Sequence, residues 1–209
     1  MLTFINGRWG KNQERGITVI TYRQVDSSYL KQYDKIPMLV HIETILALEK
    51  LDRGLGGIIL RETPVTGYIK DFGAEEKAAE YGERFDLTNW SFFMAFDGDV
   101  PIGGATVASK TEEVNMLDGR DDLTVLWDIR VDDNYKGQGV GTKLFAMAVE
   151  WSKSKGFKEM KIECQNNNVA ACRFYHKQGA VLAKIDEYAY FKDMAYKKEV
   201  QFIWYLDLS

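Results

Sequence analysis

Residues 131–144 read VDDNYKGQGVGTKL and join a strongly apolar segment to an amphipathic one. The preceding residues 123–131, LTVLWDIRV, are rich in β-branched and aromatic side chains, which predicts a central strand. Residues 142–156 carry an apolar stripe at helical spacing, which predicts a helix that ends at Gly156; the stripe comprises Leu144, Met147, Ala148 and Trp151. The sequence therefore places a glycine-rich turn between a strand and a helix.

Such a turn is suited to binding an anion. The first N–H groups of a helix have no partner within the helix, and the helix dipole adds positive potential there, so phosphate is a common ligand. The spacing Gly137-x-Gly139-x-Gly141 brings its third glycine one residue too early for a dinucleotide fingerprint. Thr142 and Lys143 stand in the wrong order for a P-loop. The residues alone leave open both a phosphate site and a tight connection without a ligand.

The rest of the chain predicts a mixed sheet with helices on its faces. A first strand is expected at 16–25, with Ile17, Val19 and Thr21 on one face, and a hairpin is expected around Asp97-Gly98. Further strands are expected at 157–164, 180–190 and 199–208, and a second helix at 167–179. A helical region is predicted from about Tyr29 to Lys50, interrupted at Pro37, and an exposed helix at 73–85. Residues 51–68 are glycine-rich and then briefly strand-like.

Composition and charge exclude several classes of protein. The net charge of −4 argues against a general nucleic-acid binder, because phosphate-backbone affinity needs clustered Lys and Arg. No apolar run approaches the ~20 residues that span a bilayer, and the N-terminus lacks the apolar core of a signal peptide, so we expect no membrane partner and a cytoplasmic location. Cys164, Cys172 and the two histidines show no metal-ligand spacing, which predicts reduced thiols and no metal; a Cys164–Cys172 disulfide is the less favoured alternative.

Two segments carry a resemblance to a known family. Residues 126–144, LWDIRVDDNYKGQGVGTKL, and residues 163–180, ECQNNNVAACRFYHKQGA, together resemble the Gcn5-related N-acetyltransferase (GNAT) superfamily. The superfamily's phosphate loop reads Q/R-x-x-G-x-G/A and is followed by N-x-x-A-x-x-x-Y; the matching residues are Lys136, Gly139, Gly141, Asn168, Ala171 and Tyr175. Lys136 departs from Gln or Arg, and Gly179-Ala180 replaces a more usual Gly-Phe.

Within the superfamily, residues 123–208 are most similar to streptothricin acetyltransferases. This similarity rests on four segments, DIRVDDNYKGQGVG, EWSKSKG, QNNNVAACRFYHKQG and FIWYLDL. The resemblance implies an α/β fold of the α+β type, with a mixed, mostly antiparallel sheet, helices on both faces and a V-shaped splay between two central parallel strands. It also implies a single domain over 1–209, in which 1–120 form an acceptor-side half with a helical cap and 121–209 bind acetyl-CoA.

The resemblance assigns acetyl-CoA to the glycine turn and the strand before it. The pyrophosphate would lie on backbone N–H groups of residues 138–142, and the pantetheine arm would pair with the strand edge at Ile129 and Val131. Asn168 would bond the pantetheine or the neighbouring backbone. A helix N-cap is the alternative role for Asn168. The expected cofactor-binding set is Ile129, Arg130, Val131, Lys136, Gly137, Gln138, Gly139, Val140, Gly141, Thr142, Asn168, Ala171 and Tyr175.

Three residues are candidates for the chemistry. The resemblance makes Tyr175 the general acid that protonates the leaving thiolate, with a core aromatic as the alternative. Asp128 interrupts an apolar strand and is the first candidate for the base that deprotonates an amine; a structural role, paired with Arg130 or a backbone donor, is the alternative. Glu163 on the next strand is the second candidate base. A backbone N–H near Ile129 would hold the tetrahedral oxyanion.

The acceptor is the least defined part of the expectation. The resemblance implies a primary amine of a small molecule, with the β-lysine amine of streptothricin as the first choice and antibiotic resistance as the role. Another small amine, a peptide N-terminus and a domain that binds acyl-CoA without turnover remain alternatives. Five acidic residues could line a mouth that attracts a cation, or be ordinary solvated side chains: Asp118, Asp121, Asp122, Asp186 and Glu187. Members of the family often form dimers, and the aromatic residues of the C-terminal strands allow a homodimer.

Overall fold

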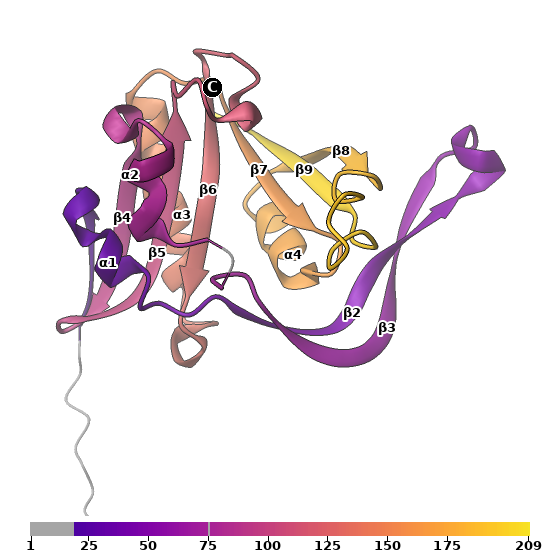
Figure 1. The fold of residues 1–209 in the computed structure, drawn as a ribbon, viewed down its shortest axis with the longest axis horizontal. Coiled ribbons are helices and arrows are strands. Elements are labelled where there is room, and N and C mark those ends of the chain that lie inside the picture. Colours follow the sequence, from indigo (N-terminus) through magenta and orange to yellow (C-terminus); the bar gives the residue numbers. More distant parts are fainter. Residues whose placement is uncertain (1–18, 75) are drawn as a thin grey trace, which may run out of the picture.

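The computed structural model describes residues 19–74 and 76–209. Its centre is a seven-stranded sheet in the order β1-β4-β5-β6-β7-β9-β8, in which only the β6–β7 pair is parallel (Figure 1). The strands are β1 (Ile20–Val25), β4 (Ser91–Asp97), β5 (Val100–Ser109), β6 (Leu123–Val131), β7 (Glu159–Gln165), β8 (Val181–Asp186) and β9 (Gln201–Asp207). The predicted mixed sheet and the hairpin at Asp97-Gly98 are confirmed; Ile17 lies outside the described residues.

Helices cover both faces of this sheet. On one face lie α1 (Leu30–Tyr33) and α2 (Tyr81–Arg84), and on the other lie α3 (Val140–Ser154) and α4 (Val169–Lys177). The alternation of β4 shows how one strand serves two cores, since Phe92, Met94 and Phe96 pack toward α1 while Phe93 and Ala95 pack toward α3. The sheet is therefore buried on both faces, which explains its nearly continuous apolar strands.

The two parallel strands separate half-way along their length. β6 pairs with β7 only from Leu123 to Leu126, and a register shift against β5 falls at the next residue, Trp127. Residues 127–131 of β6 therefore have no partner on the β7 side. The bulge ends the parallel pairing and leaves this part of the β6 edge free for another extended chain. The predicted V-shaped splay is confirmed, and it opens toward the end of β6.

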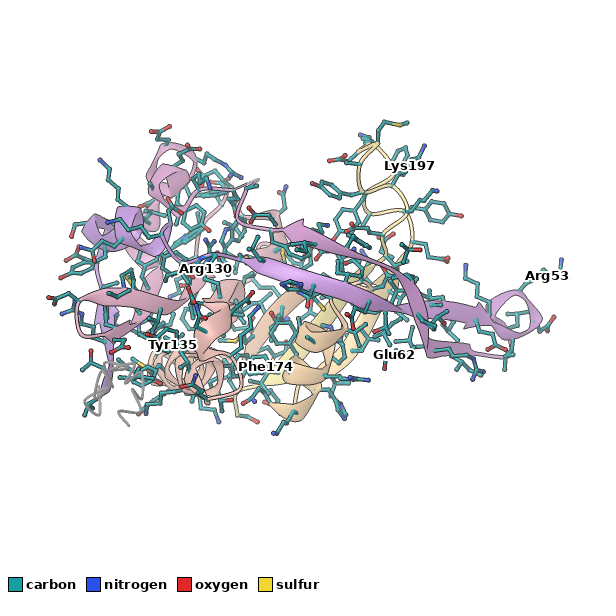
Figure 2. All side chains as sticks on the ribbon, turned by 90° about the horizontal axis from the view of Figure 1, so that it is seen from below. Arg53, Glu62, Arg130, Tyr135, Phe174 and Lys197 are labelled. Atoms are coloured by element: carbon teal, nitrogen blue, oxygen red, sulfur yellow. The ribbon has the colours of Figure 1, made fainter. Side chains whose placement is uncertain are left out.

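The largest difference from the sequence prediction is a β-hairpin in place of a helix. Residues 38–50 were expected to be helical, but helix α1 stops at Tyr33 and residues 39–50 form β2 (Leu39–Lys50), paired antiparallel with β3 (Ile58–Asp71). We call residues 39–71 the strap; its tip, with Arg53, projects from the body (Figures 1 and 2). The N-terminal half of the chain therefore carries a long two-stranded strap where a helical cap was predicted.

The second predicted helix of this half is shorter than expected. Within residues 73–85 only a 3-10 turn (Ala78–Glu80) and the four-residue α2 are helical. The segment was predicted to be exposed, but Ala78 and Tyr81 are completely buried against the sheet. Tyr81 packs beside Trp90 and Trp127, with ring centroids 5.5 and 6.4 Å away. Aromatic packing therefore holds this short segment in place.

Candidate active site

The glycine turn adopts the geometry that its sequence predicts. Gly137 and Gly139 have φ values of 75° and 84°, a region that other residues rarely adopt. Gly139 is the N-cap of α3, and the first intrahelical bond runs from Lys143 N to Gly139 O at 3.0 Å. The N–H groups of residues 140–142 therefore have no acceptor within the helix. This arrangement can hold a phosphate group.

The turn opens into a cavity of about 780 Å³ that follows the free edge of β6. One wall is formed by the end of β6 and the turn, a second by α4, and a third by residues 37–41 at the start of the strap. Of the residues predicted to bind the cofactor, Gln138 alone does not line this cavity; its side chain donates to Asn134 O at 2.8 Å. The cavity fits a long, thin ligand with an anionic end, which matches the shape and charge of acetyl-CoA.

Two positively charged residues of the predicted set are already engaged. Lys136 lines the cavity, but its Nζ contacts Asp133 Oδ1 at 2.5 Å and Leu39 O at 3.0 Å. The guanidinium of Arg130 points to the α1 side of the sheet, where Nη1 lies 3.4 Å from Ile36 O. Both cations are held by partners within the protein, whereas the first backbone N–H groups of α3 remain available to an anion.

Helix α4 supplies the far wall of the cavity. Asn168 is its N-cap, accepting from Ala171 N at 3.1 Å, so the alternative role that the sequence left open for Asn168 is present. Tyr175 also lines the cavity and is 6% exposed. Burial raises the pKa of Tyr175 well above its ordinary value, and nearby Cys164 and Asp128 add to this effect. Its phenol therefore keeps its proton at neutral pH, as a general acid must.

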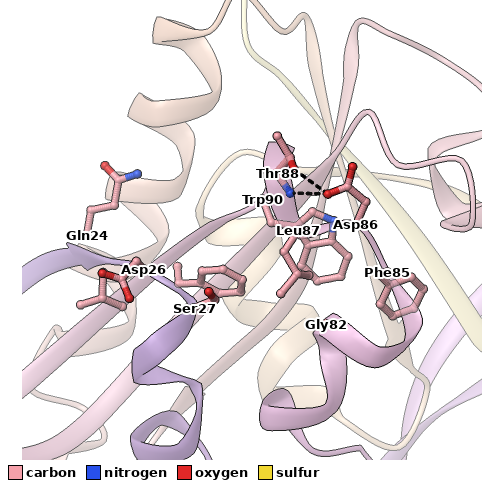
Figure 3. A pocket seen from close by; sticks show the side chains of 11 residues that line it. Gln24, Asp26, Ser27, Gly82, Phe85, Asp86, Leu87, Thr88 and Trp90 are labelled. Atoms are coloured by element: carbon pink, nitrogen blue, oxygen red, sulfur yellow. Dashed lines mark hydrogen bonds between the residues drawn. The ribbon is translucent and has the colours of Figure 1, made fainter.

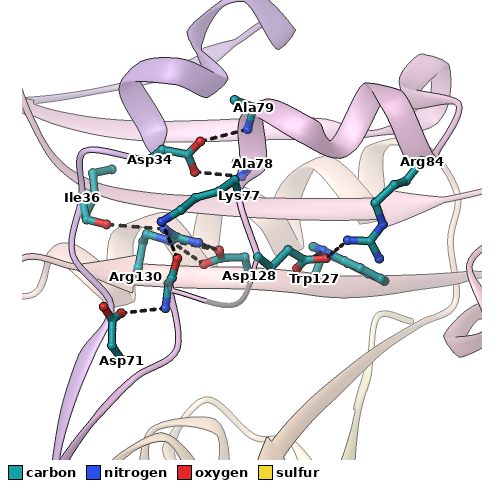
Figure 4. A network of polar contacts seen from close by, with 12 residues as sticks. Asp34, Ile36, Asp71, Lys77, Ala78, Ala79, Arg84, Trp127, Asp128 and Arg130 are labelled. Carbon is teal, nitrogen blue, oxygen red and sulfur yellow. Dashed lines mark hydrogen bonds and ion pairs between the residues drawn. The ribbon is translucent and has the colours of Figure 1, made fainter.

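Asp128 is locked in a buried ion pair (Figure 4). Arg130 Nε lies 3.1 and 3.0 Å from its two carboxylate oxygens, and Nη2 contacts one of them as well. The Arg130 guanidinium also lies over the ring of Tyr33, 4.9 Å from the ring centroid. Both oxygens of Asp128 are therefore occupied, which corresponds to the structural alternative that the sequence left open for this residue.

Glu163 is the more accessible carboxylate. It lies on β7 beyond the point of splay, half-buried, with Oε1 accepting a 2.5 Å hydrogen bond from Tyr190 Oη. Its neighbours Ile162 and Cys164 point into the α3/α4 core, so Glu163 faces the opposite side of the sheet, as Asp128 does. Among the described residues, no donor contacts its second oxygen. Glu163 and Asp128 do not line the cavity that fits acetyl-CoA.

Sequence reasoning missed the strap and the loop that carries Tyr190. The strap reaches the end of β7, where Leu46 and Asn166 exchange hydrogen bonds of 2.8 and 3.1 Å. Glu62 of the strap forms an ion pair with Arg173 of α4, and Figure 2 labels Glu62. The alternating apolar residues around the glycine-rich tip, 54–57, were the available signal for a hairpin.

The acidic residues expected at a cation-attracting mouth do not form one. Residues 118, 121 and 122 lie before the start of β6, at the closed end of the splay. Asp118 and Asp122 are paired with Lys161 and Arg120. The two remaining acidic residues lie at the end of β8: Asp186 is its last residue and contacts Lys184, and Glu187 follows it and contacts Lys50. The sequence alone did not show that these residues lie near the ends of two different strands, β6 and β8.

A second cavity, of about 700 Å³, lies between β1, β4 and α2 (Figure 3). Its carboxylates are engaged in local turns, since Asp26 accepts from Ser28 and Asp86 accepts from Thr88. These hydrogen bonds lower the pKa of both carboxyl groups, so they stay ionised as turn caps. None of the residues predicted to act in catalysis or cofactor binding lines it.

Other possible sites are limited within residues 19–74 and 76–209. No group of three or more His, Cys, Asp or Glu side chains in this part of the chain could hold a metal ion. No helix there is long and apolar enough to cross a bilayer. Cys164 and Cys172 are buried free thiols with their Sγ atoms 3.4 Å apart.

Comparison with known proteins places this site in a family. The model of the acetyltransferase (GNAT) family matches residues 58–180, which is more than half of the chain. The chain belongs to the GNAT family of acetyl-CoA-dependent N-acetyltransferases. The match includes strand β3 of the strap, the free edge of β6, the glycine turn and helix α4. The predicted GNAT fold and family are thereby confirmed.

Several relatives of this chain are named streptothricin acetyltransferases. Streptothricin acetyltransferase of Escherichia coli is 33% identical over 138 residues, which cover 66% of this chain and 67% of the relative. Streptothricin acetyltransferase A of Bacillus subtilis is 35% identical over 78 residues, but these cover only 37% of this chain and 44% of the relative. The crystal structure of a proposed streptothricin acetyltransferase from Bacillus anthracis, in complex with acetyl-CoA, has 26% identity and a TM-score of 0.72 over 92% of this chain and 99% of that one.

Proposed function

We propose that this GNAT protein transfers an acetyl group from acetyl-CoA to a primary amine of a small, streptothricin-type acceptor. The observation that supports this most is one continuous cavity, which runs from the N–H groups of the glycine turn, along the free edge of β6, to the phenol of Tyr175. Residues 121–209 would hold acetyl-CoA, and residues 1–120, with the strap, would shape the acceptor side. The streptothricin acetyltransferase relatives support the choice of acceptor, and antibiotic resistance would then be the role.

Acetyl-CoA, when bound, supplies an activated acyl group and a thiolate leaving group. The turn binds its phosphates through residues 138–142, and the free edge of β6 at Ile129 and Val131 orients the pantetheine arm. Tyr175 donates its phenolic proton to the sulfur as the carbon–sulfur bond breaks. Its raised pKa means that this proton is present at neutral pH.

The acceptor amine must lose a proton before its nitrogen can bond to the acetyl carbon. A lysine-like ammonium has a pKa near 10.4, so only about 0.1% or less is neutral at pH 7. Glu163 has one open oxygen, whereas both oxygens of Asp128 are held by Arg130. The geometry therefore favours Glu163 as the base, and Asp128 as the residue that fixes Arg130 and the end of β6.

The test is release of free CoA from acetyl-CoA in the presence of single acceptors. Streptothricin, spermidine, lysine and a short peptide would each be offered, with mass spectrometry to locate the acetyl group. We expect release with streptothricin and acetylation of its β-lysine amine, and Tyr175→Phe provides the matched control. Release only with another amine would refute the acceptor. Binding of acetyl-CoA without release with any acceptor would favour a non-catalytic binding domain.

A further inference from the structure

The loop between β8 and β9, residues 187–200, is pinned to the strap at both ends. Glu187 at its start forms an ion pair with Lys50 of β2. Glu199 near its end receives Lys70 of β3, whose Nζ lies 2.8 and 2.7 Å from the two carboxylate oxygens. Two lysines of one hairpin therefore fix the two ends of one loop. The loop, with Lys197 labelled, lies beside the strap in Figure 2.

The pair between Lys70 and Glu199 is the stronger attachment. The two side chains are only 10% and 14% exposed, whereas Lys50 and Glu187 are 41% and 36% exposed. The Lys70 ammonium also lies 4.5 Å from the ring centroid of Phe72 and 4.1 Å from that of Tyr196. Removing one partner of a mostly buried ion pair leaves the other charge uncompensated, so this contact resists opening. We call the Lys70–Glu199 pair the latch.

Between its pinned ends, the loop delivers Tyr190 to the splay. The phenol donates to Glu163 Oε1 at 2.5 Å, and its own oxygen accepts from Gln165 Nε2 at 3.2 Å. Burial, followed by the charge of Glu163, raises the pKa of Tyr190, so the phenol remains a donor. A glutamate side chain has several rotamers in water, and this hydrogen bond selects one of them. The open oxygen of Glu163 is thereby held in a fixed direction.

We propose that Tyr190 is a positioning residue that aims Glu163 at the acceptor amine, and that the latch holds Tyr190 in place. This inference rests on the proposed function, because it assumes that Glu163 receives the proton of the amine. Strap, loop and β7 then form one connected unit on the acceptor side of the sheet. The path runs from Lys70 through the loop to Tyr190 and on to Glu163.

The first test compares two tyrosines of the same loop. Tyr190→Phe removes the hydrogen bond to Glu163, while Tyr188→Phe changes a side chain that is 75% exposed. We expect Tyr190→Phe to lower kcat by about 10- to 100-fold, the range for a misaligned catalytic group. The Kd for acetyl-CoA and the KM for the acceptor should stay within about twofold, because Tyr190 does not line the cavity and misalignment of the base lowers kcat rather than binding. Equal kcat values for the two variants would overturn the proposal.

The second test asks whether the latch acts through the loop. Lys70→Met removes the charge of the latch and keeps the length of the side chain, and Lys70→Arg preserves the ion pair. The loop contains three potential trypsin sites, at Lys192, Lys197 and Lys198. We expect Lys70→Met to be cleaved faster there and to lower kcat in the same direction as Tyr190→Phe, with Lys70→Arg close to the unmodified protein. Faster cleavage with unchanged kcat would refute the coupling between latch and catalysis.

The two sets of measurements separate this inference from the proposed function. If the unmodified protein acetylates no acceptor, the proposed function fails, and with it the role of Tyr190 in catalysis. If acetylation occurs, kcat of the double variant Lys70→Met/Tyr190→Phe shows whether the two residues act together. A loss of kcat equal to the product of the two single losses means that they act independently and overturns the single path. A double variant no worse than Tyr190→Phe alone is the result expected for a single path.

Discussion

Arg130 holds both carboxylate oxygens of Asp128 from two positions further along the same strand, and both side chains are buried. The pair lies just beyond the bulge at Trp127, where β6 and β7 separate. Below it, the ring of Tyr33 fills the space left by Gly104, where a Cβ atom would come within 2.2 Å of the ring. The ion pair is thus part of the packing that supports the free edge of β6.

The first prediction concerns stability. Asp128→Asn should lower the free energy of unfolding by about 3 kcal/mol, because it leaves the guanidinium of Arg130 buried and uncompensated. Urea denaturation at pH 7 measures this loss. The double variant Asp128→Leu/Arg130→Met, which removes both charges, should be more stable than Asp128→Asn. A loss below about 1 kcal/mol in Asp128→Asn would place the pair among weak, surface-type ion pairs.

The second prediction concerns the base. Glu163→Gln should lower kcat by about 10²- to 10⁴-fold at pH 7 and leave the Kd for acetyl-CoA unchanged, since it removes a proton acceptor outside the cavity. The defect should shrink as the pH approaches about 10.4, where a lysine-like amine loses its own proton. Asp128→Asn, assayed where it is folded, should retain more activity. The opposite ranking of the two variants would restore Asp128 as the base.

Sequence predicted the elements of residues 121–209 well because their signals agree with one another. The apolar strand before residue 131, the glycines at 137 and 139, and the stripe on residues 144–151 each predict the element that is present. Asn168 and Gly179 likewise mark the limits of α4. Local chemistry and tertiary packing favour the same conformation there, so the sequence identified the walls formed by β6, the turn and α4, but not the wall formed by residues 37–41.

The strap was missed because its pattern fits two conformations. Apolar residues at 42, 45, 46 and 48 satisfy helical spacing and, within a hairpin, strand pairing equally well. Its second strand contains Pro64 and Gly67, residues that are disfavoured in strands, and the register shift between Ile42 and Thr44 accommodates them. Tertiary structure decides which segment a strand pairs with, and the sequence of the strap does not show this. The loop that carries Tyr190 is attached to the strap by ion pairs, so its position beside Glu163 could not be predicted either.

The third prediction tests the general acid. Tyr175→Phe should lower kcat by about 10²-fold or more with both substrates saturating, because the thiolate then leaves without a proton donor. Tyr188→Phe, which removes a phenol hydroxyl from a side chain that is 75% exposed, is the matched control. An unchanged kcat in Tyr175→Phe would return Tyr175 to the role of a core aromatic.

The fourth prediction concerns stability at high pH. Burial raises the pKa values of Tyr33, Tyr81 and Tyr175 in the folded protein above the ordinary value of about 10. Above pH 10 the unfolded chain releases these protons and the folded chain keeps them. The free energy of unfolding therefore falls as the pH rises above 10, by up to about 1.4 kcal/mol per pH unit for each tyrosine. Urea denaturation between pH 8 and 11 should show this decline.

Tyr81→Phe provides the control for this decline. Its hydroxyl is buried without a hydrogen-bond partner among the described residues, so its removal should cost little at pH 8. The same variant should lose stability less steeply above pH 10, because one of the three retained protons is gone. Identical slopes for the two proteins would show that Tyr81 ionises in the folded state as readily as in the unfolded chain.

The fifth prediction separates binding of acetyl-CoA from stability by using the two ends of α3. Gly139 at its start and Gly156 at its end have nearly equal φ values, 84° and 83°, and an added Cβ would meet nothing within 4 Å at either position. Gly139→Ala and Gly156→Ala should therefore each lose about 1 to 2 kcal/mol of stability from the left-handed conformation.

Only Gly139 lines the cavity, where a Cβ would keep a phosphate from the N–H groups. Calorimetric titration should show acetyl-CoA binding weakened about tenfold or more, or 1.4 kcal/mol, in Gly139→Ala alone. Equal weakening in both variants would mean that the turn does not contact the phosphates and that helix stability sets the affinity.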